Sequence, residues 1–142
     1  MPDLIWEIDD PEGVFLTFDD GPTPGITEWI LATLDKYDAK ATFFVLGKNV
    51  EMYPDLYQRI LDAGHRVGNH TYSHQKGWGM SLERYTEDVD FANDLVHSEL
   101  FRPPYARITP AQARFLGQRY KLVMWDLSLI HISEPTRPEP IS

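Results

Sequence analysis

The sequence predicts an α/β fold in which parallel strands alternate with outer helices. Short apolar segments rich in β-forming residues recur along the chain, and most are followed by a stretch with helical apolar spacing. This βαβ alternation is typical of a parallel sheet with right-handed crossovers. The polar side chains that could carry chemistry also follow the ends of predicted strands, where such folds place their sites.

The first half of the chain contains two predicted strand–helix pairs. Residues 14–18 form an apolar run bounded by turn-forming residues, which indicates a buried strand. Residues 23–39 carry apolar side chains at helical spacing, with a proline near the start, and predict a helix. Residues 40–47 form a second buried strand, and residues 53–64 have helical spacing that ends in a glycine.

The second half continues the same alternation. Ser81 and Thr109 are suited to cap two helices, because a side-chain oxygen at that position accepts a backbone N–H. The predicted elements are, in order, a strand at 65–70, a helix at 81–100, a strand ending within 100–105, a helix at 109–120 and a strand at 121–127.

The chain of 142 residues is long enough for one domain with a hydrophobic core. We expect this domain to cover residues 1–127. Residues 128–142 hold three prolines and no sustained periodicity, which predicts a disordered tail. Part of it, SLIHISEPTRP, is similar to a translated sequencing-adapter read.

Composition and charge exclude several classes of partner. A net charge of −9 argues against nucleic acid and against docking on an anionic membrane. With no cysteine, any metal needs His, Asp or Glu ligands. No apolar segment approaches the length of a membrane span, and the first residues lack the pattern of a signal peptide. The localisation and the oligomeric state stay open.

Two short stretches could form a metal site. In TFDDGP, Asp19 and Asp20 either make an ordinary turn or divide two tasks, with one binding a metal and the other taking a proton from water. In HTYSH, His70 and His74 are either hydrogen-bonded surface residues or two ligands of one metal. One carboxylate and two imidazoles leave an open coordination position, which is the layout of a catalytic zinc site.

Two further stretches could complete an active site. RPPYAR is either a rigid connector or a segment in which Arg102 clamps a carboxylate and the Tyr105 N–H faces an oxyanion. Trp125, at the end of the last predicted strand, is either a core aromatic or a pocket wall. We interpret His65 and His97 as structural. Together these stretches predict metal-assisted hydrolysis of an uncharged acyl bond, whereas a phosphoesterase would need further carboxylates.

TFDDGP, HTYSH and RPPYA, in this order, resemble the first three motifs of the polysaccharide deacetylases, which are the NodB-homology enzymes of carbohydrate esterase family 4. The resemblance covers roughly residues 4–127. It implies a distorted (β/α) barrel with parallel strands and outer helices, here incomplete, and a tail at 128–142 that is not homologous to the family.

The resemblance also implies site roles and a reaction. The reaction is hydrolysis of the linear amide of N-acetylated sugars in a chitin-like polymer or peptidoglycan, occasionally of an O-acetyl ester, often at the cell envelope or outside the cell. The metal is most often zinc, with cobalt or nickel as alternatives. The implied roles are Asp19 as base, Asp20, His70 and His74 as metal ligands, Arg102 as the residue orienting the base, Tyr105 as oxyanion donor and Trp125 as pocket wall.

The chain departs from the family pattern at three points. The acidic partner that Arg102 has in the family, soon after the tryptophan strand, is missing, because Asp126 comes too early. Ala106 stands where the family usually has glycine. The family's general acid is a histidine in a late Leu-x-His motif, and Leu129 and His131 match its letters, but too few residues separate them from Trp125. We therefore keep a second interpretation, in which the chain is an inactive truncated fragment or a glycan- or metal-binding pseudoenzyme.

Overall fold

The computed structural model describes residues 4–6 and 16–124. Within them, six strands form one sheet in the order β1-β6-β5-β4-β3-β2, and every neighbouring pair is parallel. The strands are β1 Leu4–Trp6, β2 Thr17–Asp19, β3 Thr42–Val45, β4 Arg66–Asn69, β5 Leu100–Phe101 and β6 Lys121–Met124.

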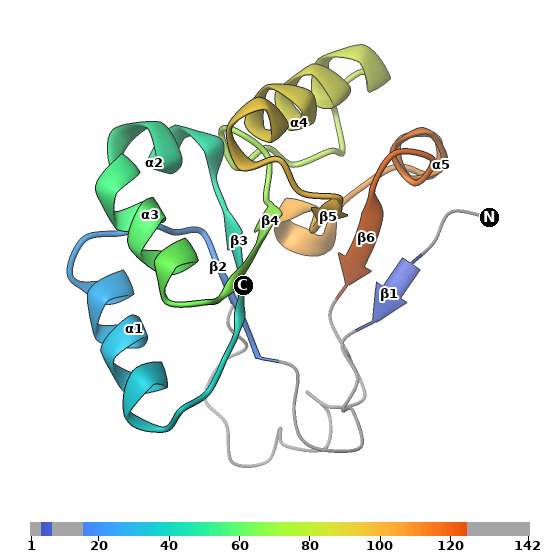
Figure 1. The fold of residues 1–142 in the computed structure, drawn as a ribbon. Coiled ribbons are helices and arrows are strands. Elements are labelled where there is room, and N and C mark those ends of the chain that lie inside the picture. The colour runs from blue at the N-terminus through green and yellow to red at the C-terminus, as the bar shows by residue number, and fades with distance from the viewer. Residues whose placement is uncertain (1–3, 7–15, 125–142) are drawn as a thin grey trace.

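The sheet is curled, and the helices lie outside it (Figure 1). From β2 to β6 each strand pairs with the next one along the chain, as in a singly wound barrel, so the crossover helices collect on one face. The predicted α/β class and the incomplete barrel are thereby confirmed. The helices are α1 Ile26–Lys36, α2 Gly47–Met52, α3 Pro54–Asp62, α4 Leu82–Val96, the 3-10 turn η1 Pro104–Ala106 and α5 Pro110–Leu116.

Both predicted helix caps are confirmed. The Ser81 hydroxyl accepts a hydrogen bond from the Arg84 N–H, and the Thr109 hydroxyl accepts one from the Gln112 N–H. The Gln112 side chain accepts in return from the Thr109 N–H, which completes a capping box around Pro110. These caps set where α4 and α5 begin.

Several predicted boundaries were wrong. The strand predicted at residues 14–18 is β2, which covers Thr17–Asp19 in the described part of the chain and so extends to the first carboxylate of the pair. The helix predicted to residue 100 ends at Val96, because His97 adopts a left-handed φ of 54° before β5.

Three elements were not predicted, one of them the 3-10 turn η1 at Pro104–Ala106. The three-residue β1 pairs with β6 near the other end of the chain, and α2 is a single short helix directly after β3. Neither is long enough to show a periodic pattern.

The core divides into two main clusters on the helical side of the sheet. Around β3, buried side chains of the strand pack with α1 and α3, including Phe43, Leu34 and Ile60. Around β5 and β6, Phe101 and Leu122 pack with α4 and α5. These clusters hold the strands in register, and the register fixes the positions of the side chains at their carboxyl ends.

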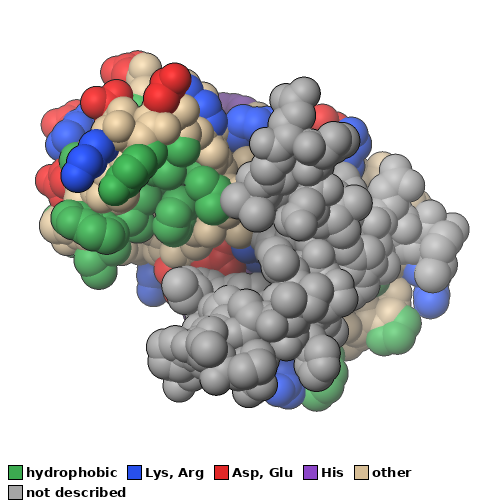
Figure 2. Space-filling model, turned by 90° about the horizontal axis from the view of Figure 1, so that it is seen from below, with side chains coloured by type: hydrophobic (Ala, Val, Ile, Leu, Met, Phe, Trp, Pro, Cys, Tyr) green, Lys and Arg blue, Asp and Glu red, His purple; other side chains and the backbone are tan. Residues whose placement is uncertain are grey.

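The outer face of α1 exposes large apolar side chains. Ile26 and Trp29 lie on this helix and Tyr37 directly follows it, and all three are exposed. Hydrophobic side chains gather in the same region in the view from below (Figure 2). None of the helices in the described part of the chain has the length and apolarity that a membrane crossing requires.

Candidate metal centre and active site

The candidate site lies at the carboxyl ends of three strands. Asp19 is the last residue of β2 and Asp20 follows it, while His70 and Arg102 come directly after β4 and β5. β2 and β4 flank β3, and β5 lies beside β4. Because all of these strands are parallel, their carboxyl ends meet at one edge of the sheet. The structure therefore brings together polar residues separated by more than eighty positions, as in the 2.8 Å contact between Asp19 and Arg102.

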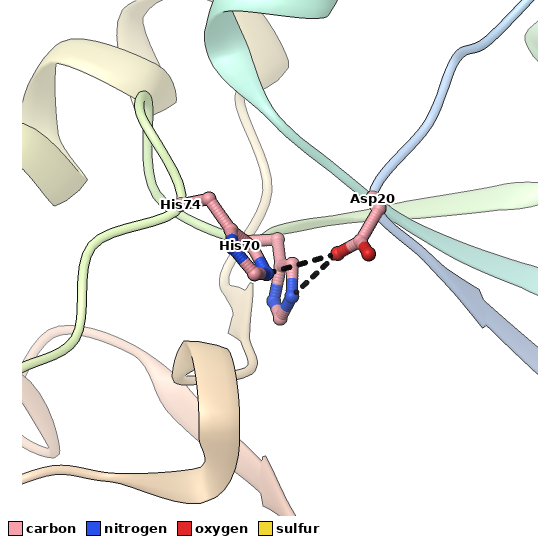
Figure 3. Close-up of side chains that lie close together, drawn as sticks. All are labelled: Asp20, His70 and His74. Atoms are coloured by element: carbon pink, nitrogen blue, oxygen red, sulfur yellow. Dashed lines mark ion pairs between the residues drawn. The ribbon is translucent and has the colours of Figure 1, made fainter. Parts of the chain in front are cut away.

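Asp20, His70 and His74 point toward one another (Figure 3). Asp20 Oδ1 lies 3.2 Å from His70 Nε2 and 3.1 Å from His74 Nε2. One ligand atom from each residue lies within 4.8 Å of the other two. Thr71 and His74, in the loop that follows β4, both adopt positive φ angles.

A hydrogen bond defines which nitrogen of His70 faces Asp20. His70 Nδ1 lies 2.7 Å from the Arg102 carbonyl oxygen, which can only accept, so Nδ1 carries the hydrogen. In the neutral imidazole, Nε2 then directs a lone pair toward Asp20 Oδ1. Both of these atoms, and His74 Nε2, are buried without a hydrogen-bond partner among the described residues. Two nitrogens and a carboxylate oxygen arranged this way fit a divalent cation.

The charge states of the cluster agree with ligand chemistry. Burial acts to raise the pKa of Asp20, but the neighbouring His70 and His74 outweigh it and hold this pKa below its usual value. Burial lowers the pKa of His74, with smaller contributions from His70 and Lys48 and an opposing one from Asp20. A carboxylate and a neutral imidazole are the forms that bind metal.

Asp19 forms an ion pair with Arg102. Arg102 Nη1 donates a 2.8 Å hydrogen bond to Asp19 Oδ1, and both side chains are almost fully buried. Burial raises the pKa of Asp19 to about 7, His70 opposes this shift, and Asp20 adds to it. The second oxygen, Asp19 Oδ2, is buried and has no hydrogen-bond partner among the described residues. A carboxylate with this pKa and a free oxygen can act as a general base.

Arg102 is held from several strands at once. Its Nε donates to the Val123 carbonyl oxygen at 3.3 Å, and Nη1 also donates to Thr17 Oγ1 at 3.0 Å. The guanidinium carbon lies 4.4 Å from the centre of the Phe44 ring. Burial lowers the pKa of Arg102 to about 10, so it stays charged at neutral pH. A fixed, charged guanidinium in this place orients the Asp19 carboxylate.

Tyr105 lies beside the metal cluster. Its exposed ring is 4.7 Å from the His74 ring, measured between centroids, and its backbone is left-handed with a φ of 62°. The hydrogen bonds of η1 are donated by Ala106 and Arg107, and the Tyr105 amide takes part in neither. Ala106 also has a positive φ of 54°, a conformation that costs an alanine about 1 kcal/mol or more relative to glycine.

Of the remaining residues named from the sequence, the structure describes His65 and His97. His65 and His97 are structural as predicted, because His65 Nδ1 accepts from the Ala41 N–H and His97 ends α4. Trp125, Leu129, His131 and the predicted tail at 128–142 lie outside the described residues, so their proposed roles stay predictions.

Sequence reasoning missed two asparagines that support the site. Asn69 is fully buried, and its side chain donates to the Val89 carbonyl and accepts from the Thr71 N–H. Asn49 donates to the carbonyl oxygens of Asp20 and Pro22. Apart from the local contact between Asn69 and Thr71, no sequence spacing indicates these hydrogen bonds, since the others reach elements distant in the chain.

The fold and the site together define a singly wound α/β protein with an Asp/His/His cluster beside a buried Asp–Arg pair. Comparison with known proteins then identifies the family. The model of the polysaccharide deacetylase family matches residues 8–121, and the chain belongs to this family.

Two curated relatives are a peptidoglycan-N-acetylglucosamine deacetylase of Bacillus cereus and chitin deacetylase 1 of Saccharomyces cerevisiae. The first is 36% identical over 130 residues, which covers 82% of this chain and 45% of the relative. The second is 37% identical over 132 residues, covering 85% of this chain and 42% of the relative. The chain thus spans less than half the length of these two relatives.

Solved structures of a deacetylase and of a related pseudoenzyme have a fold similar to that of this chain. A crystal structure of a peptidoglycan N-acetylglucosamine deacetylase bound to a substituted N-oxidanyl-benzamide has a TM-score of 0.81 and 32% identity, covering 86% of this chain and 60% of that one. A carbohydrate esterase family 4 pseudoenzyme from Bacillus anthracis also has a TM-score of 0.81, with 25% identity, covering 99% of this chain and 52% of that one. The fold therefore occurs in both enzymes and a pseudoenzyme.

Proposed function

We propose that this chain is the metal-binding and base-carrying part of a hydrolase that removes N-acetyl groups from an amino-sugar polymer, either peptidoglycan or a chitin-like chain. Membership of the polysaccharide deacetylase family supports the reaction class. The observation that carries the proposal is the convergence of Asp20 Oδ1 with Nε2 of His70 and His74, next to the buried Asp19.

In this proposal Asp20, His70 and His74 hold a divalent metal, with zinc as the first choice and cobalt or nickel as alternatives. Three nitrogen and oxygen ligands with an open position are typical of catalytic zinc. When bound, the metal would polarise the acetyl carbonyl and make an attached water more acidic.

The remaining steps fall to side chains and one backbone amide of the protein itself. Asp19 takes the proton of the attacking water through its unpaired Oδ2, while Arg102 holds the other oxygen. The Tyr105 N–H donates to the oxyanion that forms as the acetyl carbon becomes tetrahedral. Trp125 is proposed as a wall of the substrate pocket.

None of the histidines among the described residues is left to act as the proton donor for the leaving amine. Of their histidines, His70 and His74 belong to the metal cluster, His65 is engaged with Ala41 and His97 ends α4. This observation favours a second candidate function, a glycan- or metal-binding protein without turnover, and a pseudoenzyme among the structural neighbours supports it.

Zinc binding tests the first part of the proposal. We expect the unmodified chain to bind one zinc ion and the double variant His70→Ala, His74→Ala to bind none, because a single carboxylate on the surface retains little affinity. Competition with a chromogenic zinc chelator measures both. His97→Asn, which alters a histidine far along the chain from the cluster and tolerates the left-handed backbone, should bind zinc like the unmodified chain. Equal zinc uptake by the double variant would contradict the proposal.

A further inference from the structure

The loop that carries His70 and His74 is held by two helices. The N–H groups of Gly47 and Lys48, at the start of α2, donate to the carbonyl oxygens of Thr71 and Tyr72 at 3.0 and 3.1 Å. A side chain at position 47 would not fit there, because an added Cβ would lie 2.7 Å from the Tyr72 ring. The start of α2 therefore satisfies the loop's carbonyl groups.

The amide groups of the same loop are satisfied from α4 by one carboxylate. Asp88 Oδ2 accepts hydrogen bonds from the N–H groups of Tyr72 and Ser73 at 3.0 and 3.2 Å. Asp88 Oδ1 accepts a third from the Ser73 hydroxyl at 3.0 Å. Hydrogen bonds to an ionised acceptor are stronger than those between neutral groups, so this contact can determine the loop's shape.

The Asp88 carboxylate makes no hydrogen bond to its own helix among the described contacts. It lies within α4, where the backbone amides are already paired, and the start of α4 is capped by Ser81. All the hydrogen bonds found for its carboxylate go to Tyr72 and Ser73, which lie between the two histidines.

We propose that Asp88 is a positioning residue that holds the loop in the conformation in which His70 and His74 face Asp20. The inference rests on the metal role proposed for these histidines. Thr71 and His74 both adopt positive φ angles, and such conformations persist where the surrounding structure determines them. Asp88 fixes this conformation through its hydrogen bonds with Tyr72 and Ser73, which lie between Thr71 and His74.

Asp90 offers a matched control on the same helix. Its carboxylate accepts from the Tyr120 hydroxyl at 2.7 Å and pairs with Arg119 Nη1 at 2.9 Å. Asp88→Asn and Asp90→Asn are thus the same substitution two positions apart. Each removes one negative charge from α4, but only the first removes contacts with the loop.

The experiment measures the zinc dissociation constant, the visible spectrum of the cobalt-substituted protein and amide exchange in the metal-free chain. We expect Asp88→Asn to weaken zinc binding by about 10- to 100-fold, the range found when partners of metal ligands are removed. Its cobalt spectrum should change, and the Tyr72 and Ser73 amides should exchange faster. Asp88→Glu, which keeps the carboxylate, should recover part of the affinity. Asp90→Asn should lower thermal stability without changing the zinc affinity, the spectrum or these two amides.

The outcomes separate this inference from the proposed function. If the unmodified chain binds zinc and Asp88→Asn binds it equally well with unchanged loop amides, the positioning role of Asp88 is wrong and the metal site stands. If no variant binds zinc, the proposed function fails, while loss of amide protection in Asp88→Asn would still support the positioning role. Should Asp88→Asn not fold, Ser73→Ala replaces it. A few-fold loss of zinc affinity then supports the inference, and an unchanged affinity overturns it.

Discussion

At the scale of single residues, the site depends on charged groups that are buried and paired. Arg102 is the clearest example, because one side chain contacts the base on β2 and a carbonyl oxygen on β6, while its own carbonyl fixes the tautomer of His70. Removing one partner of such a buried pair leaves the other charge uncompensated. The proposed base and a proposed metal ligand are therefore both positioned through the same residue.

His65 predicts a pH dependence of stability that is separate from the metal site. Burial, with a smaller contribution from Lys40, lowers the pKa of His65 in the folded chain below its ordinary 6.5. As the pH falls below 6.5, the unfolded chain takes up a proton that the folded chain does not, so the free energy of unfolding decreases. The loss is at most about 1.4 kcal/mol per pH unit for this one group. Above pH 6.5 the contribution is fully retained.

Urea denaturation between pH 5 and 8 measures this effect. In His65→Asn the amide oxygen can still accept from the Ala41 N–H, but the side chain no longer titrates. We expect the variant to lose less stability on acidification than the unmodified chain. Parallel curves for the two proteins would show that His65 does not contribute.

At the scale of elements, helices with caps or strong periodicity could be predicted and the shortest elements could not. Thr109 and Ser81 were predicted as caps because their local sequence contains both the donor and the acceptor of the cap. In contrast, α2 and β1 are defined by partners elsewhere in the chain, so no local pattern marks them.

Gly68 provides a test of the packing between neighbouring strands. It lies beside Phe44 in the register of β3 and β4, and an added Cβ would be 2.5 Å from the nearest atom of that fully buried ring. We expect Gly68→Ala to lower the free energy of unfolding by about 1 to 3 kcal/mol, the usual cost of overpacking a core. Thermal and urea denaturation measure the loss.

A second substitution separates overpacking from other effects at this position. Replacing the ring in Gly68→Ala, Phe44→Leu makes room for the new methyl group. The double variant should therefore be more stable than the sum of the two single changes predicts. Strict additivity, or a Gly68→Ala variant as stable as the unmodified chain, would contradict this account.

At the scale of the whole molecule, the described residues supply one part of the proposed chemistry. They hold the candidate metal ligands, the proposed base and the arginine, and the chain spans 45% of the Bacillus cereus relative. A leaving amine also needs an acid, which no described histidine is free to provide. In the proposed reaction, a histidine acting as this acid would therefore have to lie outside the described residues.

Acetate release from chitin oligomers and from peptidoglycan fragments tests this expectation. We expect the unmodified chain to release little or no acetate, and a fusion carrying the corresponding carboxyl-terminal part of the Bacillus cereus relative to release it. Asp19→Asn in the fusion should abolish release because it removes the proposed base. If instead the unmodified chain is active and His131→Ala abolishes that activity, then His131 is the acid and the second candidate function is wrong.

The sequence by itself determined the α/β class, the order of most elements and the identity of the candidate ligands. These properties follow from local periodicity, from capping residues and from side-chain types that fit one chemistry. The tertiary structure alone decided how the ligands meet, because Asp20 follows β2 and the two histidines follow β4, and only the sheet places these strands on either side of β3. It also decided which groups support them. The Asp88 carboxylate, on α4, accepts hydrogen bonds from Tyr72 and Ser73, between the two histidines, and these residues meet only in the folded chain.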